Sequence, residues 1–203
     1  MTQIAIRDAS IPFNVELGSA LRLSDDELFE LCGRNPELRI ERTPEGDLIV
    51  MTPAGGESSH RNARLVTAIM GWADRDGTGV AFDATAGFLL PNGAMRSPDA
   101  AWVERSRWRA LEPEQRRGFV PLAPDFVLEL RSPSDRLPDL RAKMEEYRAC
   151  GVRLGWLIDP EERRVHVYRP DRVPEVLEAP PRVAADPELP GFVLDLKSIW
   201  APA

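Results

Sequence analysis

A chain of 203 residues, 43% hydrophobic and 29% charged, is long enough to bury a full core, and we expect one globular domain. No window holds the roughly 18 consecutive apolar residues of a membrane span, and the N-terminus lacks the layout of a signal peptide. We therefore expect a cytoplasmic protein without membrane contact, and a net charge of −7 disfavours non-specific wrapping of nucleic acid while leaving room for a local basic groove.

The basic residues are distributed very unequally. Of the 26 basic residues only Lys143 and Lys197 are lysines, and all the others are arginines. An ammonium group can lose its proton near neutral pH, whereas a guanidinium cannot. Both lysines are therefore candidate functional residues. The cysteines, Cys32 and Cys150, have no neighbouring ligand at metal-binding spacing, so we expect free thiols.

The first half of the chain predicts a helix, a hairpin and a second helix. In LSDDELFELCGRNP, Ser24 and Glu27 form a capping-box pattern, which is typical of a helix start. The segment LRIERTPEGDLIVMTP predicts two strands around the turn PEGD. From Glu57 to Asp76, apolar residues recur at helical spacing, and Gly77 marks the end of a long amphipathic helix.

The second half predicts mostly strands with one further helix. In chain order we expect consecutive antiparallel strands in GVAFDATAGFLL and SPDAAWVE, a polar arginine-rich excursion (105–124), a strand in DFVLELRS, a helix in LPDLRAKMEEYRACGV, a strand pair in LGWLID and RVHVYRP, and a strand-like run in LPGFVLDLKSIW. His166, in RVHVYRP, is expected at the surface. The order of elements indicates an α/β fold with a central mixed sheet flanked by helices, preceded by an N-terminal helix and hairpin. We expect a single domain (1–203) with its core at about 38–170 and a tail (171–203) that packs on it.

Two strands that are suited to burial each carry an acid. Asp99 stands at the start of its strand, and Glu129 shares one face of its strand with Val127 and Arg131, because alternate residues of a strand face the same way. If the two strands are neighbours, Asp99 and Glu129 converge. Two adjacent carboxylates repel each other unless a proton or a cation lies between them, and hard oxygen ligands suit Mg²⁺ or Mn²⁺.

The ordered motifs LPNGAMRSPDAAWV, the run from PDFVLELRSPSD to RVHVYRP, and LPGFVLDL carry a family resemblance. A "PD" at a strand start, a later strand with Glu-x-basic and then a crossover helix resemble the PD-(D/E)XK nuclease superfamily. More closely, the chain is similar to the Uma family, a large group of bacterial proteins classed as candidate restriction endonucleases, over roughly residues 24–200. The resemblance implies a restriction-endonuclease-like core.

The resemblance also implies a Mg²⁺-dependent (or Mn²⁺-dependent) endonuclease that acts on DNA, with homodimerisation by analogy. Asp99 and Glu129 would be metal ligands, and Arg131 stands where the superfamily has a catalytic lysine. An arginine can stabilise developing negative charge but cannot act as a base. Lys143, on the helix after the Glu129 strand and in line with Asp139 and Tyr147, is placed to take over that role. A third ligand is implied at Glu41, with Glu57 or His60 as alternatives on the first long helix.

Structural interpretations of the same residues remain open. Asp99 is also suited to capping a strand after a proline, Glu129 to an ion pair with Arg131, and Lys143 to a surface pair with Asp139. Two other functions also remain open. One is a catalytically inactive nuclease fold that serves as a binding module, and the other is a metal-dependent hydrolase of small phosphate esters.

Overall fold

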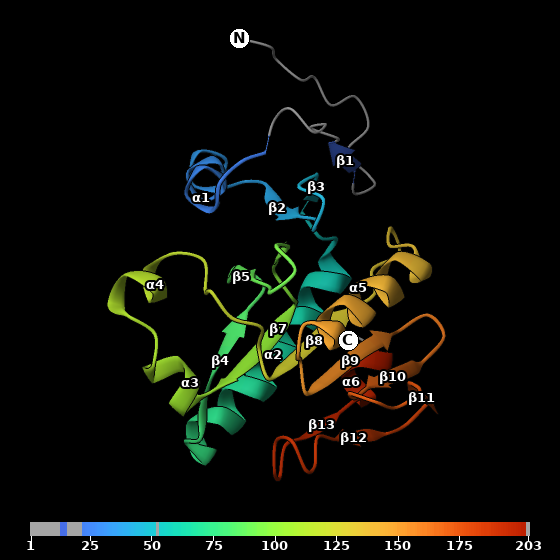
Figure 1. The fold of residues 1–203 in the computed structure, drawn as a ribbon. Coiled ribbons are helices and arrows are strands. Elements are labelled where there is room, and N and C mark those ends of the chain that lie inside the picture. The colour runs from blue at the N-terminus through green and yellow to red at the C-terminus, as the bar shows by residue number, and fades with distance from the viewer. Residues whose placement is uncertain (1–12, 16–21, 52, 202–203) are drawn as a thin grey trace.

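The computed structural model describes residues 13–15, 22–51 and 53–201 (Figure 1). In these ranges the chain forms a large sheet with helices packed on it, and a smaller sheet that stands beyond one end of the large one (Figure 1). Among the described helices, none combines the length and hydropathy that a bilayer-spanning segment needs.

The large sheet is mixed, as expected. Its strands lie in the order β11 (Glu175–Glu178), β10 (Arg164–Tyr168), β9 (Leu154–Asp159), β8 (Phe126–Leu130), β7 (Ala100–Glu104) and β4 (Gly79–Asp83). Neighbouring strands run antiparallel except β8 and β9, which are parallel. Helix α5 (Leu137–Ala149) joins this parallel pair, so the predicted strand–helix–strand crossover is confirmed.

The small sheet contains the predicted hairpin. Its strands lie in the order β1 (Phe13–Val15), β3 (Leu48–Met51), β2 (Arg39–Arg42), β6 (Met95–Arg96) and β5 (Phe88–Leu89). The prediction of consecutive antiparallel strands between residues 79 and 104 is wrong in part. Strand β4 pairs directly with β7, and the β5–β6 hairpin between them joins the small sheet instead, because β6 pairs with β2.

Helices α1 (Asp25–Arg34) and α2 (Gly56–Asp76) confirm the two predicted N-terminal helices. Ser24 and Glu27 exchange the reciprocal hydrogen bonds of a capping box, and α2 ends at Gly77 with a left-handed φ of 72°. The arginine-rich excursion contains two short helices that the sequence did not predict, α3 (Arg105–Arg109) and α4 (Pro113–Arg117). The last segment forms strands β12 (Arg182–Ala184) and β13 (Val193–Asp195) and helix α6 (Lys197–Trp200).

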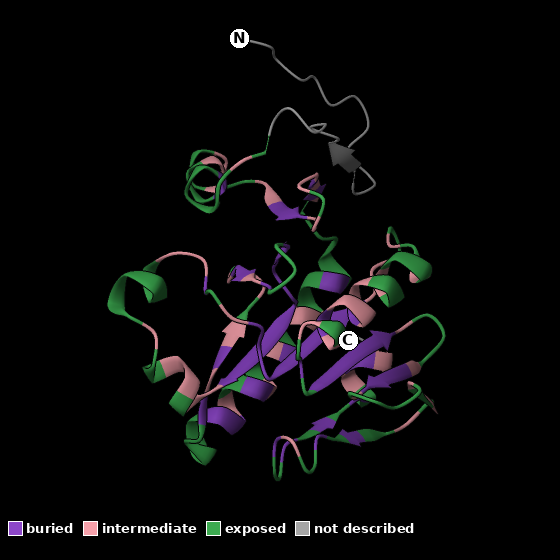
Figure 2. Cartoon of the chain, in the orientation of Figure 1, coloured by how far each residue is buried: buried purple, intermediate pink, exposed green. Residues whose placement is uncertain are grey.

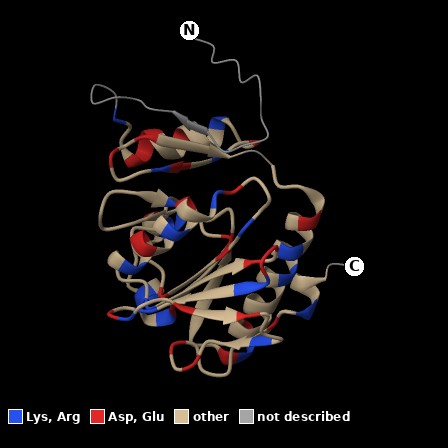
Figure 3. Cartoon of the chain, turned by 90° about the vertical axis from the view of Figure 1, so that its right-hand side faces the viewer, with Lys and Arg blue, Asp and Glu red and all other residues tan. Residues whose placement is uncertain are grey.

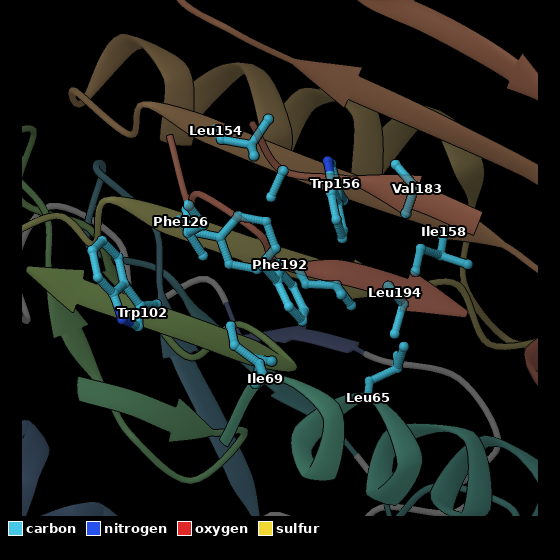
Figure 4. Packing of buried hydrophobic residues seen from close by; sticks show 14 of the residues in the cluster. Leu65, Ile69, Trp102, Phe126, Leu154, Trp156, Ile158, Val183, Phe192 and Leu194 are labelled. Carbon is cyan, nitrogen blue, oxygen red and sulfur yellow. The ribbon is translucent and has the colours of Figure 1, made fainter. Parts of the chain in front are cut away.

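The two faces of the large sheet are covered by different elements. Alternate residues of β8 divide between them: Phe126, Leu128 and Leu130 face α2 and the C-terminal segment, whereas Val127 faces α5. The C-terminal segment contributes Phe192, whose ring stacks on Trp156 with centroids 5.7 Å apart (Figure 4). The inner strands of this sheet, from β7 to β10, are almost continuously buried, whereas the edge strand β11 is mostly exposed (Figure 2).

Helix α5 packs over strand β9 at Gly155. A Cβ atom at this position would meet the terminal methyl group of Met144, on α5, at 2.5 Å, which is far inside van der Waals contact. The glycine therefore provides the room that the Met144 side chain occupies between helix and sheet.

His166 on β10 is buried, with 3% of its surface exposed, so the expected surface position is wrong. Strand β11 pairs with β10 and places Val176 opposite His166, so β10 is not an edge strand. Burial lowers the pKa of His166. Both cysteines are free, as predicted.

Candidate active site

Asp99 and Glu129 come together because their strands are neighbours. Strands β7 and β8 pair with Ala100 opposite Leu128, and one further step in this register sets Asp99 opposite Glu129. Both side chains are buried, with 6% and 3% of the residue exposed. The predicted convergence of the two acids is therefore seen in the structure, on the face of the sheet that α5 covers. Charged segments of both signs lie where the small sheet approaches this end of the large sheet (Figure 3).

Asp99 is held by hydrogen bonds from three elements. The backbone N–H of Leu130, on β8, donates to Oδ2 at 2.8 Å. Oδ1 accepts from Arg39 Nη1 of β2 at 3.1 Å and from Asn62 Nδ2 of α2 at 3.3 Å. Since Ser97 O also accepts from Arg39, the small sheet is bonded to the chain on both sides of Pro98.

Lys143 bridges two glutamates. Its Nζ lies 2.8 Å from Glu41 Oε1 and 2.8 Å from Glu129 Oε1, so the ammonium group holds the two carboxylates close together. One turn further along α5, the Tyr147 hydroxyl donates to the same Glu129 oxygen at 2.9 Å. No donor among the described residues reaches the other oxygen, Oε2, which is the atom of Glu129 that remains open to a ligand.

Glu41 is the centre of a second group of contacts. Its Oε1 accepts from the backbone N–H of Ser97 at 3.0 Å, and its Oε2 accepts from Arg96 Nη1 at 3.2 Å. The Nε of Arg96 also donates to Glu146 Oε2 at 2.5 Å. Arg96 therefore joins a glutamate of β2 to a glutamate of α5, and the two sheets and the helix meet through charged side chains.

The cluster holds one more carboxylate than it holds cations. Its charged members are four acids and three bases, namely Glu41, Asp99, Glu129, Glu146, Arg39, Arg96 and Lys143. A buried charge is costly unless it is balanced, so one acid is the natural place for a proton or for part of the charge of a metal ion.

The two glutamates that share Lys143 have opposite pKa shifts. Burial would raise the pKa of Glu41, but the positive charges of Lys143, Arg96 and Arg39 outweigh it and lower the pKa to about 2. Burial raises the pKa of Glu129 to about 7, and the negative charges of Asp99 and Glu41 add to this, although Lys143 opposes it. Glu129 is therefore the acid that takes up a proton near neutral pH.

Arg131 and Lys143 do not have the ion-pair partners that the structural interpretations of the sequence gave them. Arg131 does not pair with Glu129, because its Nη1 bonds to Asp159 Oδ2 at 2.8 Å and lies 3.2 Å from Glu161 Oε2. Lys143 does not pair with Asp139, which lies 3.7 Å from Arg136 instead. Both structural interpretations of these side chains are therefore wrong.

Of the three candidates for a third ligand, only Glu41 lies in the cluster. The side chain of Glu57 is 76% exposed and pairs with Arg61 one turn further along α2. His60 is exposed and accepts a hydrogen bond from Arg64. The residue of α2 that reaches Asp99 is Asn62.

The cluster has oxygen donors that suit a divalent cation, but it is not a closed protein cage. Among residues 22–51 and 53–201, no group of three or more His, Cys, Asp and Glu side chains is arranged to hold a metal ion. Mg²⁺ commonly binds through one or two carboxylates and completes its shell with water and substrate phosphate. The carboxylates of Asp99 and Glu129 fit that mode of binding, and the Oε2 atom of Glu129 is open to the cation.

Sequence reasoning missed Arg39, Arg96 and Asn62 as parts of the site. In β2, Arg39 and Glu41 share a face, since alternate residues of a strand point the same way, so the strand that supplied Glu41 also contained the signal for Arg39. Arg39 differs from the other two cations in its exposure: 32% of its side chain is accessible, against 12% for Lys143 and 9% for Arg96.

Comparison with known proteins identifies first the fold and then the family. A protein from Anabaena variabilis described as a "putative nuclease belonging to DUF820" has a similar crystal structure, with a TM-score of 0.71 and 24% identity over 88% of this chain and 97% of that one. The fold is therefore the expected restriction-endonuclease-like α/β fold. Residues 25–197 match the Uma2 family, described as "Putative restriction endonuclease", and the chain belongs to this family. No curated protein matches it.

Proposed function

We propose that the chain is a Mg²⁺- or Mn²⁺-dependent endonuclease that hydrolyses phosphodiester bonds in DNA. The observation that carries this proposal is the position of Asp99 and Glu129 on neighbouring strands with Lys143 against Glu129, in a chain of the Uma2 family. Paired carboxylates that bind a divalent cation, with a fixed positive charge beside them, are the groups that phosphodiester hydrolysis uses.

A divalent cation bound here would polarise the scissile phosphate and lower the pKa of an attacking water. Asp99 and Glu129 would hold it, kept in orientation by the N–H of Leu130 and the hydroxyl of Tyr147. Burial opposes the charge on Lys143, but Glu129 and Glu41 raise its pKa. We therefore assign Lys143 the stabilisation of negative charge on the phosphate and not the role of base. Arg39, the most exposed cation of the cluster, is placed to meet the phosphate first.

Arg131 in the usual lysine position was the feature that favoured an inactive binding module. Because Arg131 is bound to Asp159 and Lys143 lies against Glu129, this substitution no longer argues against activity. The proposal includes a cytoplasmic location and a homodimer, since one active centre in each chain cuts both DNA strands in one encounter only when two chains meet.

The test combines metal titration with plasmid nicking. Calorimetric titration of Mg²⁺ and Mn²⁺ is made into the wild-type protein and into the Asp99→Asn, Glu129→Gln double variant, whose side chains keep their size. We expect metal binding and nicking in the wild type and the loss of both in the variant. Metal binding without nicking, but with hydrolysis of small phosphate esters, would contradict the choice of DNA as substrate.

The two lysines of the chain provide a matched pair of variants. Lys143→Ala should lower kcat by about 10²–10³-fold, the range found when one preorganised donor to the transition state is removed. Lys197→Ala, at an exposed position in α6, should leave the nicking rate unchanged. Equal rates in the two variants would refute the role of Lys143, and a wild-type protein that binds no metal at millimolar concentration would favour the binding module.

A further inference from the structure

Asn62 is a polar, half-buried member of the stripe of helix α2 that faces the core. Ser58, Asn62, Leu65, Ile69 and Trp72 follow one another at spacings of four and three, so they lie on one face of the helix. Four of these residues are buried in the described structure. The amide occurs where this stripe reaches Asp99.

One polar atom of the Asn62 amide, Nδ2, has a hydrogen-bond partner among the described residues, and the other, Oδ1, has none. Nδ2 donates to Asp99 Oδ1 at 3.3 Å, and this fixes the orientation of the amide, because a carboxylate oxygen can only accept there. The carbonyl atom Oδ1 is buried and accepts no hydrogen bond from any described residue. A buried acceptor without a donor is rare in folded proteins and points to a water or an ion that occupies its other side.

We propose that Asn62 Oδ1 is an oxygen ligand of the divalent cation that Asp99 and Glu129 hold, an inference that rests on the proposed function. An amide oxygen is a hard, neutral ligand of the kind that Mg²⁺ and Mn²⁺ accept. Neutrality suits this cluster, which already holds more carboxylates than cations. A further acid at this position would have to be balanced as well. Asn62 thus takes the place in α2 that Glu57 and His60, both directed to solvent, do not fill.

The experiment measures Mn²⁺ affinity by calorimetry and by the electron paramagnetic resonance of free Mn²⁺, without DNA, for the wild type, Asn62→Ala and Asn62→Asp. The alanine variant should bind Mn²⁺ about 10–100-fold more weakly. The aspartate variant should bind at least as tightly as the wild type, because its carboxylate still offers an oxygen although it cannot donate to Asp99. Asn62→Ser, with a side chain too short to reach the cation, replaces the alanine variant if that variant does not fold.

Asn35→Asp is the control, because Asn35 also donates its amide to an oxygen atom, the carbonyl of Leu31, but at the end of α1 and outside the charged cluster. Its Mn²⁺ affinity should stay within about twofold of the wild type. If Asn62→Asp binds as weakly as Asn62→Ala, Asn62 only positions Asp99, and the inference is overturned. Unchanged affinity in both variants would mean that Oδ1 meets only water, which also overturns it. A wild-type protein that binds no Mn²⁺ would defeat the proposed function itself.

Discussion

The two faces of strand β8 have very different surroundings. Phe126 and Leu128 enter an apolar cluster in which Trp156 and Phe192 stack (Figure 4). Glu129, between Leu128 and Leu130 in sequence, enters a buried cluster of acids and bases. The first face supplies folding free energy, whereas the second keeps charges in a position that stability alone would not select. The strand therefore supports the chemistry of one face with the packing of the other.

The largest loss of stability should come from removing an aromatic ring of the apolar face, and it tests whether the two faces are independent. Phe192→Ala deletes a buried ring that contacts Trp156, Phe126 and Trp72, and should lower the free energy of unfolding by about 3–5 kcal/mol. Mn²⁺ affinity of the folded variant should stay unchanged, because the charged cluster is on the opposite face. Urea unfolding measures the first quantity and calorimetry the second. The neighbouring Val193→Ala, at a half-exposed site, should cost less than about 0.5 kcal/mol. A parallel loss of metal affinity in Phe192→Ala would show that the two faces are coupled.

A smaller, pH-dependent effect should come from neutralising the charged face. The folded-state pKa of Glu129 is raised above its ordinary value to about 7, so its contribution to stability is fully present below pH 4.5 and is lost as pH rises through 7. Glu129→Gln should remove that loss. In metal-free buffer the variant should exceed the wild type by roughly 1–3 kcal/mol at pH 8.5, since one unit of pKa corresponds to about 1.4 kcal/mol. The difference should shrink below pH 6. Thermal unfolding across this pH range provides the check, and a difference independent of pH would contradict the assignment.

The smallest expected effect concerns the exposed edge of the cluster. If Arg39 contacts a DNA phosphate, Arg39→Gln should reduce the slope of log K for DNA against log salt concentration by about 0.9, while Arg39→Lys should keep it. Fluorescence anisotropy with a labelled duplex in Ca²⁺ measures the slope without cleavage. Arg182→Gln, which removes an exposed arginine of β12, should leave the slope as it is. An unchanged slope in Arg39→Gln would limit Arg39 to holding Asp99.

The parts of the fold that the sequence predicted are those with local signals. The capping box of α1, the turn of the β2–β3 hairpin and the start of α5, with Pro138 in its first turn, are each determined by residues a few positions apart. The β5–β6 hairpin was placed in the wrong sheet because its partner, β2, lies some fifty residues earlier. His166 was placed at the surface because alternation in β10 cannot reveal that β11 pairs with this strand and makes it an inner strand of the sheet.

The candidate site shows the same limit. Asp99 and Glu129 were found because each stands out in an apolar run, and Lys143 because lysine is rare in this chain. Arg39 and Arg96 gave no such signal among many arginines, and their partners lie 60 and 55 residues away. Arg131 was given a partner on its own strand, but the parallel neighbour β9 offered Asp159 instead. Pairings across strands need the sheet order, which a single sequence does not contain.

The packing of α5 over Gly155 extends from the fold to the site. Lys143 and Tyr147 both reach Glu129 from α5, and Met144 of the same helix lies between them in sequence with its terminal methyl group over Gly155. An alanine at position 155 would bring a Cβ atom to 2.5 Å from that methyl group, so the Met144 side chain would have to change its conformation. The residue between the two that bind Glu129 is therefore accommodated by a glycine of the neighbouring strand.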